Sequence, residues 1–219
     1  MATDWMQVGV VRGDDGRRRC GWCASAPDYI AYHDDEWGRP VTDDVRLYEK
    51  ICLEGFQSGL SWLTILRKRE GFRRAFAGFE PAKVARYGPR QVERLLGDAD
   101  IVRHRGKIEA TIANARATLD AQDRHGSLAA VVWSFEPRRR GRSAPARLGD
   151  IASLTPESKA LSKRLAELGF RFVGPTTAYA AMQSLGLVND HLTGCHVRAA
   201  CERDRRAVDP PRPTVDEPA

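Results

Sequence analysis

Apolar side chains recur at steps of three and four residues along most of this chain, which is the spacing of one face of an α-helix. One such run predicts a long helix that ends near Gly126, with a buried face formed by Ile108, Ile112, Ala115 and Leu119. Apolar and polar residues do not alternate over a length typical of a β-strand. The pattern therefore predicts an all-α fold.

Capping residues, prolines and glycines mark the ends of further helices. Thr42 or Asp43 can cap a helix with Leu47 and Ile51 on one side, and a second apolar helix follows, with Leu60, Leu63, Ile65 and Leu66. Proline favours the first turn of a helix and glycine its end. The later helices are accordingly expected to begin at Pro89, Pro156 and Pro175, and the last two to end at Gly169 and Gly186.

The two ends of the chain are expected to lie outside the packed core. Residues 1–16 are polar and rich in glycine, and residues 203–219 contain four of the chain's 12 prolines. We therefore predict a flexible extension at 1–16, one domain at 17–202 and a disordered tail at 203–219. Residues 136–143 form an Arg-rich loop, which is either a solvated surface insert or a contact to a phosphate backbone.

Composition narrows the class of protein. The chain has 219 residues, of which 42% are hydrophobic and 29% charged, as in a globular protein. No apolar run is long enough for a membrane span or a secretory signal, and five cysteines without a disulfide framework favour a reducing cytoplasm. The net charge of +6 favours a polyanionic partner but does not by itself distinguish a nucleic-acid binder from a basic soluble protein.

Two pairs of metal-ligand residue types lie near the two ends of the predicted domain. Cys20 and His33 come early, and His191 and Cys195 come late. Together they form a Cys2His2 set that suits tetrahedral zinc and leaves no open position for water. The alternatives are that these side chains fill core, or that Cys20 and Cys23 form a redox C-x-x-C, although the residues after Cys23 do not suit the βαβ setting of that motif.

A carboxylate and several aromatic residues suggest a second kind of site. Glu54 lies at an otherwise apolar helix end, eight residues before Trp62. Aromatic faces and one carboxylate suit a pocket for a flat cationic base, although aromatic clusters also form ordinary core. The further aromatic candidates, which crowd the early metal-ligand segment, are Trp22, Tyr29 and Tyr32.

A short polar turn joins two predicted helices at residues 96–107. Backbone N–H groups at the start of the second helix can bind a phosphate, and basic side chains add positive charge at the same end. An exposed helical hairpin without a ligand explains the same residues equally well. The basic side chains are Arg103, His104, Arg105 and Lys107.

Six motifs together closely resemble 3-methyladenine DNA glycosylase I, a family of helix-hairpin-helix DNA glycosylases. The resemblance extends in order from Arg19 to Cys195. It rests on Arg-Cys-Gly-Trp at 19–22, Tyr-Ile-Ala-Tyr-His-Asp-x-Glu-Trp-Gly at 29–38, Ile-Cys-Leu-Glu-Gly at 51–55, Gly-Leu-Ser-Trp at 59–62, Arg-His-Arg-Gly-Lys-Ile at 103–108 and Gly-Leu-Val-Asn-Asp-His at 186–191.

The resemblance implies a bacterial, monomeric, cytoplasmic base-excision repair enzyme that binds double-stranded DNA containing alkylated bases. Such an enzyme flips 3-methyladenine out of the duplex and hydrolyses its N-glycosidic bond. The resemblance also implies one structural zinc ion per chain, which joins the N- and C-terminal segments as a cap on the helical bundle. The matching zinc ligands are Cys20, His33, His191 and Cys195.

The same resemblance assigns roles to the pocket and the hairpin. Glu54 is expected to recognise the base, or to act as the general base for water, and Trp62 to stack on the base. Gly59 and Leu60 are expected to enter the space that the extruded nucleotide leaves, and the 96–107 hairpin to bind phosphates. The remaining pocket wall would be Trp22, Tyr29 and Tyr32.

No lysine stands within the matched pocket motifs, so we expect a monofunctional glycosylase without lyase activity. Two other classes remain open from the residues themselves. One is a zinc-stapled DNA-binding module that lacks catalysis. The other is a zinc hydrolase, which requires that water replace one of the four ligands.

Overall fold

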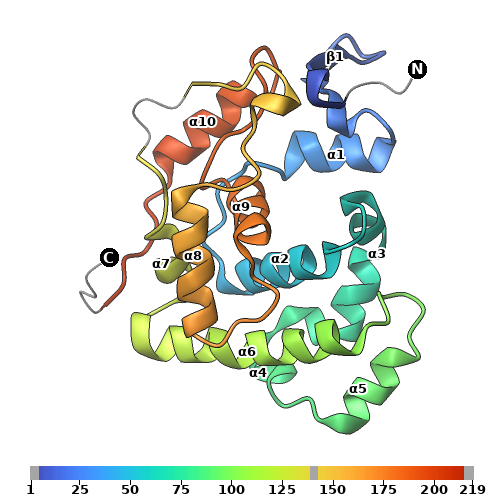
Figure 1. Ribbon diagram of the computed structural model, residues 1–219, viewed down its shortest axis with the longest axis vertical. Helices are drawn as coiled ribbons and strands as arrows, with labels where there is room; N and C mark the ends of the chain where they lie inside the picture. Colours follow the sequence, from blue (N-terminus) through green and yellow to red (C-terminus); the bar gives the residue numbers. More distant parts are fainter. Residues whose placement is uncertain (1–4, 139–142, 215–219) are drawn as a thin grey trace.

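The fold is a bundle of helices with one small hairpin of strands, seen in a computed structural model that describes residues 5–138 and 143–214 (Figure 1). The first half comprises η1 (Trp5–Gln7), β1 (Val10–Arg12), β2 (Arg18–Cys20), η2 (Gly21–Cys23), α1 (Pro27–Asp35), α2 (Asp44–Gln57), α3 (Trp62–Ala75), η3 (Ala77–Phe79) and α4 (Pro81–Val84). The second half comprises α5 (Pro89–Leu96), α6 (Arg105–His125), α7 (Leu128–Trp133), η4 (Leu148–Asp150), α8 (Pro156–Glu167), α9 (Pro175–Ser184) and α10 (Arg198–Ala207). The predicted all-α class is confirmed.

Helix α2 is the centre of the bundle, in contact with α3, α6, α7 and α9 (Figure 1). It begins at Asp44, and the side chain of the preceding Asp43 accepts a hydrogen bond from the Arg46 N–H at 2.9 Å, so Asp43 rather than Thr42 is its cap. Its buried side chains extend from Leu47 to Phe56 and include polar Glu49 and Glu54. A helix with so little exposed surface fixes the position of every side chain that it carries.

The other predicted helix boundaries agree closely with the structure. Helix α6 ends at His125, and Gly126 follows with a φ of 82°, a backbone conformation that glycine adopts without strain. Gly169 and Gly186 follow α8 and α9 in the same way, with φ values of 93° and 78°. The second apolar helix starts at Trp62, two residues after Leu60, because Ser61 caps it.

The hairpin between α5 and α6 packs closely against α3. A Cβ atom on Gly71 would lie 2.4 Å from the Asp100 carbonyl oxygen, so only glycine fits at this crossing. The Lys68 ammonium donates to the Ala99 carbonyl oxygen at 2.7 Å, and Arg74 pairs with the Asp100 carboxylate at 2.9 Å. These contacts fix the predicted phosphate-binding turn relative to α3.

The predicted flexible extension at 1–16 is wrong for the residues that the structure describes there. Strand β1 pairs antiparallel with β2, with Val10 opposite Cys20. Arg19 is buried and pairs with Asp15 at 2.6 Å and Asp34 at 2.8 Å, so the hairpin is anchored to α1. Sequence analysis missed it because each strand has only three residues. Residues 1–4 lie outside the described part of the chain.

The predicted tail also begins too early, because α10 continues to Ala207. Arg205 is buried, and its guanidinium donates to the carbonyl oxygens of Gly186 and Leu187, each at 2.7 Å. The Thr214 N–H donates to the His125 carbonyl oxygen at 3.4 Å. Residues 215–219, and residues 139–142 of the Arg-rich loop, lie outside the described residues. In the described ranges, no helix is long and apolar enough to cross a membrane.

Replacing Gly71 by alanine tests the close crossing of α3 and the hairpin. We expect Gly71→Ala to lower the free energy of unfolding by about 1–3 kcal/mol, because the added methyl group forces the backbones apart. Urea denaturation measures this change. Gly97→Ala, in the same hairpin, is the matched control, since its φ is −85° and its Cβ would make only an ordinary contact at 3.4 Å. Equal stabilities of the two variants would contradict the proposed crossing.

Candidate functional site

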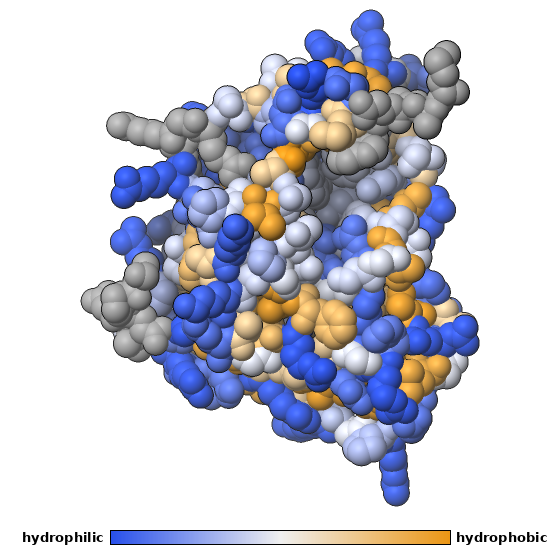
Figure 2. Space-filling view, viewed as in Figure 1, coloured by the Kyte–Doolittle hydropathy of each residue, from blue (hydrophilic) through white to orange (hydrophobic). Residues whose placement is uncertain are grey.

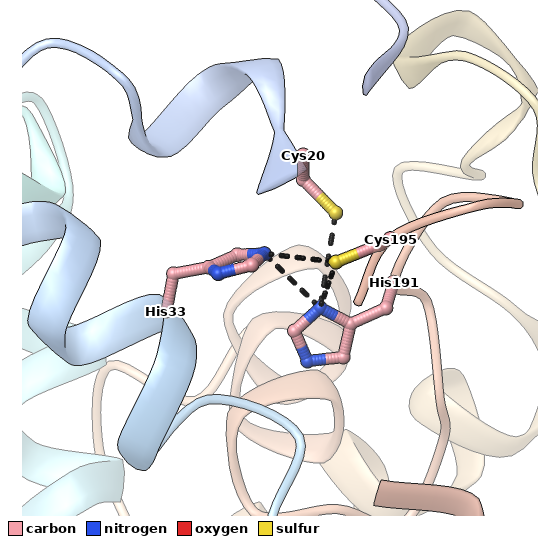
Figure 3. Close-up of side chains that lie close together, drawn as sticks. All are labelled: Cys20, His33, His191 and Cys195. Atoms are coloured by element: carbon pink, nitrogen blue, oxygen red, sulfur yellow. Dashed lines mark hydrogen bonds between the residues drawn. The ribbon is translucent and has the colours of Figure 1, made fainter. Parts of the chain in front are cut away.

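The four predicted metal ligands lie together and point toward one another (Figure 3). Their ligand atoms all lie within 4.8 Å of one another, and all four side chains are buried. The His33 Nε2 atom is 3.2 Å from His191 Nδ1 and 3.4 Å from Cys195 Sγ. His191 Nδ1 is 3.7 Å from the sulfur of Cys20 and also 3.7 Å from that of Cys195.

These separations match a tetrahedral zinc site. Zn–N and Zn–S bonds of ordinary length place two nitrogens roughly 3.3 Å apart and a nitrogen and a sulfur roughly 3.6 Å apart. The arrangement draws on the end of β2, the second half of α1 and the loop that follows α9. The fold therefore brings together two histidines that are 158 residues apart in the sequence.

Neighbouring groups hold the ligands in orientation. The second ring nitrogen of His33 lies 2.7 Å from the Asp34 carboxylate, and that of His191 lies 3.0 Å from the Trp37 carbonyl oxygen. The Leu192 N–H donates to Cys20 Sγ at 3.2 Å. Although burial opposes it, hydrogen bonds from Arg19 and the two neighbouring histidines lower the pKa of Asp34 to about 2. An ionised Asp34 is a good partner for a metal-bound imidazole.

The cysteine chemistry agrees with a metal site. The hydrogen bond from Cys20, followed by those from His191 and His33, lowers the pKa of the Cys195 thiol, so the cluster already favours a thiolate, the form that binds metal. All five cysteines lie within the described residues, and each is a free thiol. Cys23, the other half of the C-x-x-C, lies outside the four-residue cluster. His196 instead contacts Asp34, at 3.1 Å.

A second group of side chains lies where α1, α2 and α3 meet. The Tyr32 and Trp62 rings are 5.4 Å apart, and Glu54 is 5% exposed, behind them on α2. Beside these rings is a cavity of about 460 Å³, open to solvent. On the face shown in Figure 2 the surface is hollowed between the part that carries α1 and the part that carries α3. The cavity is lined by Tyr32, Glu36, Val41, Arg46, Glu49, Lys50, Leu53, Trp62, Arg69, Arg73, Ser184 and Leu185.

The other two predicted aromatic residues lie between this pocket and the metal-ligand cluster. Trp22 packs edge-on against Tyr29, with ring centroids 4.9 Å apart, and against His33, at 5.2 Å. Neither Trp22 nor Tyr29 lines the cavity. Burial, with Cys23 and Glu54 nearby, raises the pKa of Tyr29 to about 12, so its hydroxyl stays protonated. The indole N–H of Trp62 is buried and finds no acceptor among the described residues.

Lys50 is the principal residue of this group that sequence analysis missed. Its ammonium lies 2.9 Å from Glu54 Oε1, 2.7 Å from the Tyr32 hydroxyl oxygen and 3.4 Å from the centre of the Trp62 ring. Burial lowers the pKa of Lys50, while the Glu54 charge acts in the opposite direction. The signal was present in the sequence, because residues four apart on a helix share a face. Lys50 directly precedes the motif at 51–55, so the resemblance assigns it no role.

The predicted DNA-contacting residues divide into exposed and buried groups. Gly59 has a φ of 82° and turns the chain just before Leu60, which is 42% exposed. Arg103 and Arg105 are exposed at the start of α6, and Arg105 pairs with Glu93 at 2.7 Å. The loop at Gly59 and Leu60 therefore exposes an apolar side chain to solvent, and the start of α6 exposes two basic side chains.

The remaining two hairpin residues have structural roles. Lys107 is buried, and its ammonium donates to the carbonyl oxygens of Phe56 at 2.8 Å and Ser58 at 2.6 Å, at the end of α2. The prediction that Lys107 contacts DNA is therefore wrong, because the end of α2 already engages this cation. The exposed side chain of His104 caps α6, accepting from the Lys107 N–H at 3.2 Å.

Phe172 is a further residue that the sequence did not indicate. It is 38% exposed and has a φ of 58°, which is uncommon for a bulky residue. Its ring centre lies 6.3 Å from that of His104 in the hairpin. Asn114 holds the adjacent backbone by accepting from the Arg171 N–H at 2.7 Å. Backbone strain of this kind is concentrated at functional sites.

Comparison with known proteins agrees with this geometry. The family model described as methyladenine glycosylase matches residues 22–199. A DNA-3-methyladenine glycosylase 1 from Escherichia coli (strain K12) is 51% identical over 81% of this chain and 95% of its own length. A DNA-3-methyladenine glycosylase from Haemophilus influenzae is 44% identical over 81% of this chain and 96% of its own length.

A solved structure shares the fold. It is 3-methyladenine DNA glycosylase I from Staphylococcus aureus, from a study of 3-methyladenine recognition. It superimposes with a TM-score of 0.76 at 34% identity and covers 82% of this chain and 96% of that one. The match to the family model includes the pocket residues and three of the four metal-ligand residues, and begins two residues after Cys20. The chain therefore belongs to the methyladenine glycosylase family.

Proposed function

We propose that this protein is a DNA-repair glycosylase that flips 3-methyladenine out of alkylated double-stranded DNA and hydrolyses its N-glycosidic bond. The observation that carries the proposal is the buried Glu54 carboxylate beside the Trp62 and Tyr32 rings, in a chain of the methyladenine glycosylase family. A flat cation finds both of its preferred partners there, an aromatic face and an anion.

The chemistry of the substrate suits a site with few catalytic groups. Methylation at N3 makes adenine a cation, so the N9–C1′ bond breaks with its electron pair passing to a base that leaves neutral. Water adds at C1′ and loses a proton to solvent. The protein then mainly selects, extrudes and orients the nucleotide. We assign Glu54 to base recognition, with general-base action on the water as the alternative.

We further propose that the four-residue cluster binds one structural zinc ion per chain. The residues that would hold it are Cys20, His33, His191 and Cys195, whose separations fit a closed tetrahedral site. The ion would supply cross-linking alone, because four protein ligands leave no position for water. Since Tyr32 directly precedes His33 on α1, the cluster would hold one wall of the pocket.

The DNA is proposed to lie across the hairpin and the loop before α3. Leu60 would enter the duplex where the nucleotide leaves, Gly59 would allow the turn, and Phe172 adds a second exposed apolar side chain beside the hairpin. Phosphates would meet backbone N–H groups at the start of α6, with Arg103 and Arg105 alongside. We also propose that the protein acts as a monomer in the bacterial cytoplasm, which light scattering and cell fractionation would check.

Base release from methylated DNA tests the reaction and the role of Glu54. Wild type is expected to free 3-methyladenine and to leave the strand intact until alkali is added, as a monofunctional glycosylase does. Glu54→Gln should lower kcat/KM by about 10- to 100-fold, since a charged hydrogen bond contributes about 1.5–3 kcal/mol. Liquid chromatography of the released base measures both results.

Exposed Glu167 provides the matched control, because Glu167→Gln removes the same charge from α8. Failure of wild type to free 3-methyladenine would contradict the proposed function. Full activity of Glu54→Gln would contradict only the role of Glu54, and strand cleavage before alkali would contradict the monofunctional reaction.

Metal content and stability test the zinc proposal. Purified protein should contain one zinc ion per chain by elemental mass spectrometry, and Cys195→Ser should lose it together with more than about 2 kcal/mol of unfolding free energy. At low temperature, Cys195→Ser should still release the base. Cys52 is also buried, but it lies on α2 outside the cluster, so the control variant Cys52→Ser should retain the metal. Base release that stopped in a folded Cys195→Ser variant would instead indicate a catalytic metal.

The salt dependence of DNA binding tests the hairpin. Arg103→Ala should weaken binding to duplexes of any sequence and reduce the slope of log affinity against log salt by about one, as expected for one lost phosphate contact. Fluorescence anisotropy at several salt concentrations measures the slope. Lys163→Ala removes an equally positive side chain from α8, where it is 81% exposed, and should leave the slope unchanged. An identical slope in both variants would place the DNA elsewhere.

A further inference from the structure

The Lys50 ammonium already makes the three contacts expected of a bound cationic base. It forms an ion pair with Glu54 at 2.9 Å and a hydrogen bond with the Tyr32 hydroxyl at 2.7 Å. It also lies 3.4 Å from the centre of the Trp62 ring, which is direct contact with the ring face. A base cannot stack on the same part of this ring while the ammonium stays there.

Lys50 also separates Glu54 from the open cavity. Lys50, Tyr32 and Trp62 all line the cavity, whereas Glu54 does not and is 5% exposed. A base that enters the cavity can therefore reach the Glu54 carboxylate only if the lysine side chain moves.

We propose that Lys50 occupies the base-recognition groups in the DNA-free protein and that the flipped 3-methyladenine cation binds by displacing its ammonium. This inference rests on the proposed function, because it identifies the residue that competes with the base for the same pocket. Lys50 is thus a specificity-determining residue: only a ligand that satisfies Glu54 and the Trp62 face as well as an ammonium does can replace it.

Electrostatics favours exchange over joint occupancy. Two cations beside one buried carboxylate repel each other, so the bound base and the ammonium exclude one another. A neutral adenine offers Glu54 no compensating charge and leaves the ion pair in place. Two further carboxylates line the same cavity, but Glu36 already pairs with Arg69 and Glu49 with Arg73, so the displaced ammonium moves toward solvent. Burial also lowers the pKa of Lys50, so the charged amine gains by moving toward solvent.

The same competition acts after the bond is broken. The released 3-methyladenine is neutral, whereas the lysine remains a cation and again pairs with Glu54 more favourably. Return of Lys50 therefore expels the product, and the protein avoids inhibition by the base that it releases.

Binding of free 3-methyladenine tests the competition. Lys50→Met keeps the length of the side chain and removes its charge, so it should bind the free base at least tenfold more tightly than wild type, which is about 1.4 kcal/mol. Calorimetry measures the affinity, and inhibition of base release by added 3-methyladenine should strengthen in parallel. Lys163→Met, which removes a lysine charge from the surface of α8, should match wild type. Equal or weaker binding by a folded Lys50→Met variant would overturn the inference.

Amine labelling of wild type gives a second test that does not depend on a variant. Saturating 3,9-dimethyladenine, which keeps the positive charge of the base in the nucleotide, should increase acetylation of Lys50 severalfold, as measured by mass spectrometry, while exposed Lys163 serves as the internal reference. Unchanged or decreased labelling would show that the base binds without moving Lys50. Wild type that releases 3-methyladenine but fails both tests would overturn this inference alone, whereas wild type that releases no base would overturn the proposed function itself.

Discussion

An ionised carboxylate inside a helical bundle requires a compensating positive charge, and this requirement organises the pocket. Glu54 lies on α2, a largely buried helix, and a charge there without a partner would strongly destabilise the fold. Lys50, one turn earlier on the same helix, satisfies it at 2.9 Å. The fold thus contains a buried carboxylate whose cationic partner can be exchanged. Because this carboxylate requires a cation for the fold to be stable, the pocket selects for cationic ligands.

The cluster of Cys20, His33, His191 and Cys195 extends this organisation to the ends of the domain. Helix α1 supplies His33 to the cluster and Tyr32 to the pocket from consecutive positions, so a shift of one would move the other. Trp22 packs against both His33 of the cluster and Tyr29 on the same helix. The cluster and the pocket are therefore two parts of a single packed unit.

The sequence predicted the helices well, because periodic burial and capping are local properties. The ends of α6, α8 and α9 could be predicted because a glycine with positive φ follows each helix, as is common where helices end. The N-terminal hairpin was missed because three-residue strands carry no periodic signal. Its position is fixed by ion pairs of Arg19 with Asp15 in the same hairpin and with Asp34 on α1. The cluster of Cys20, His33, His191 and Cys195 could be predicted because the family resemblance matched these four residues to one ligand set. Their types and spacing alone had left core packing and a redox motif open. Lys50 was missed, and Lys107 was wrongly predicted to contact DNA, because a lysine side chain can lie at the surface or inside the fold and only tertiary packing decides which.

The buried ammonium of Lys107 connects the two functional surfaces in one further respect. It ties the first turn of α6 to the last carbonyl groups of α2, the helix that carries Glu54. A DNA backbone bound at the start of α6 would consequently lie at a set distance and angle from the Glu54 carboxylate. In the proposed complex with DNA, the Lys107 contacts set the distance between the strand bound at α6 and the Glu54 carboxylate. A flipped nucleotide would have to span that distance to reach the pocket.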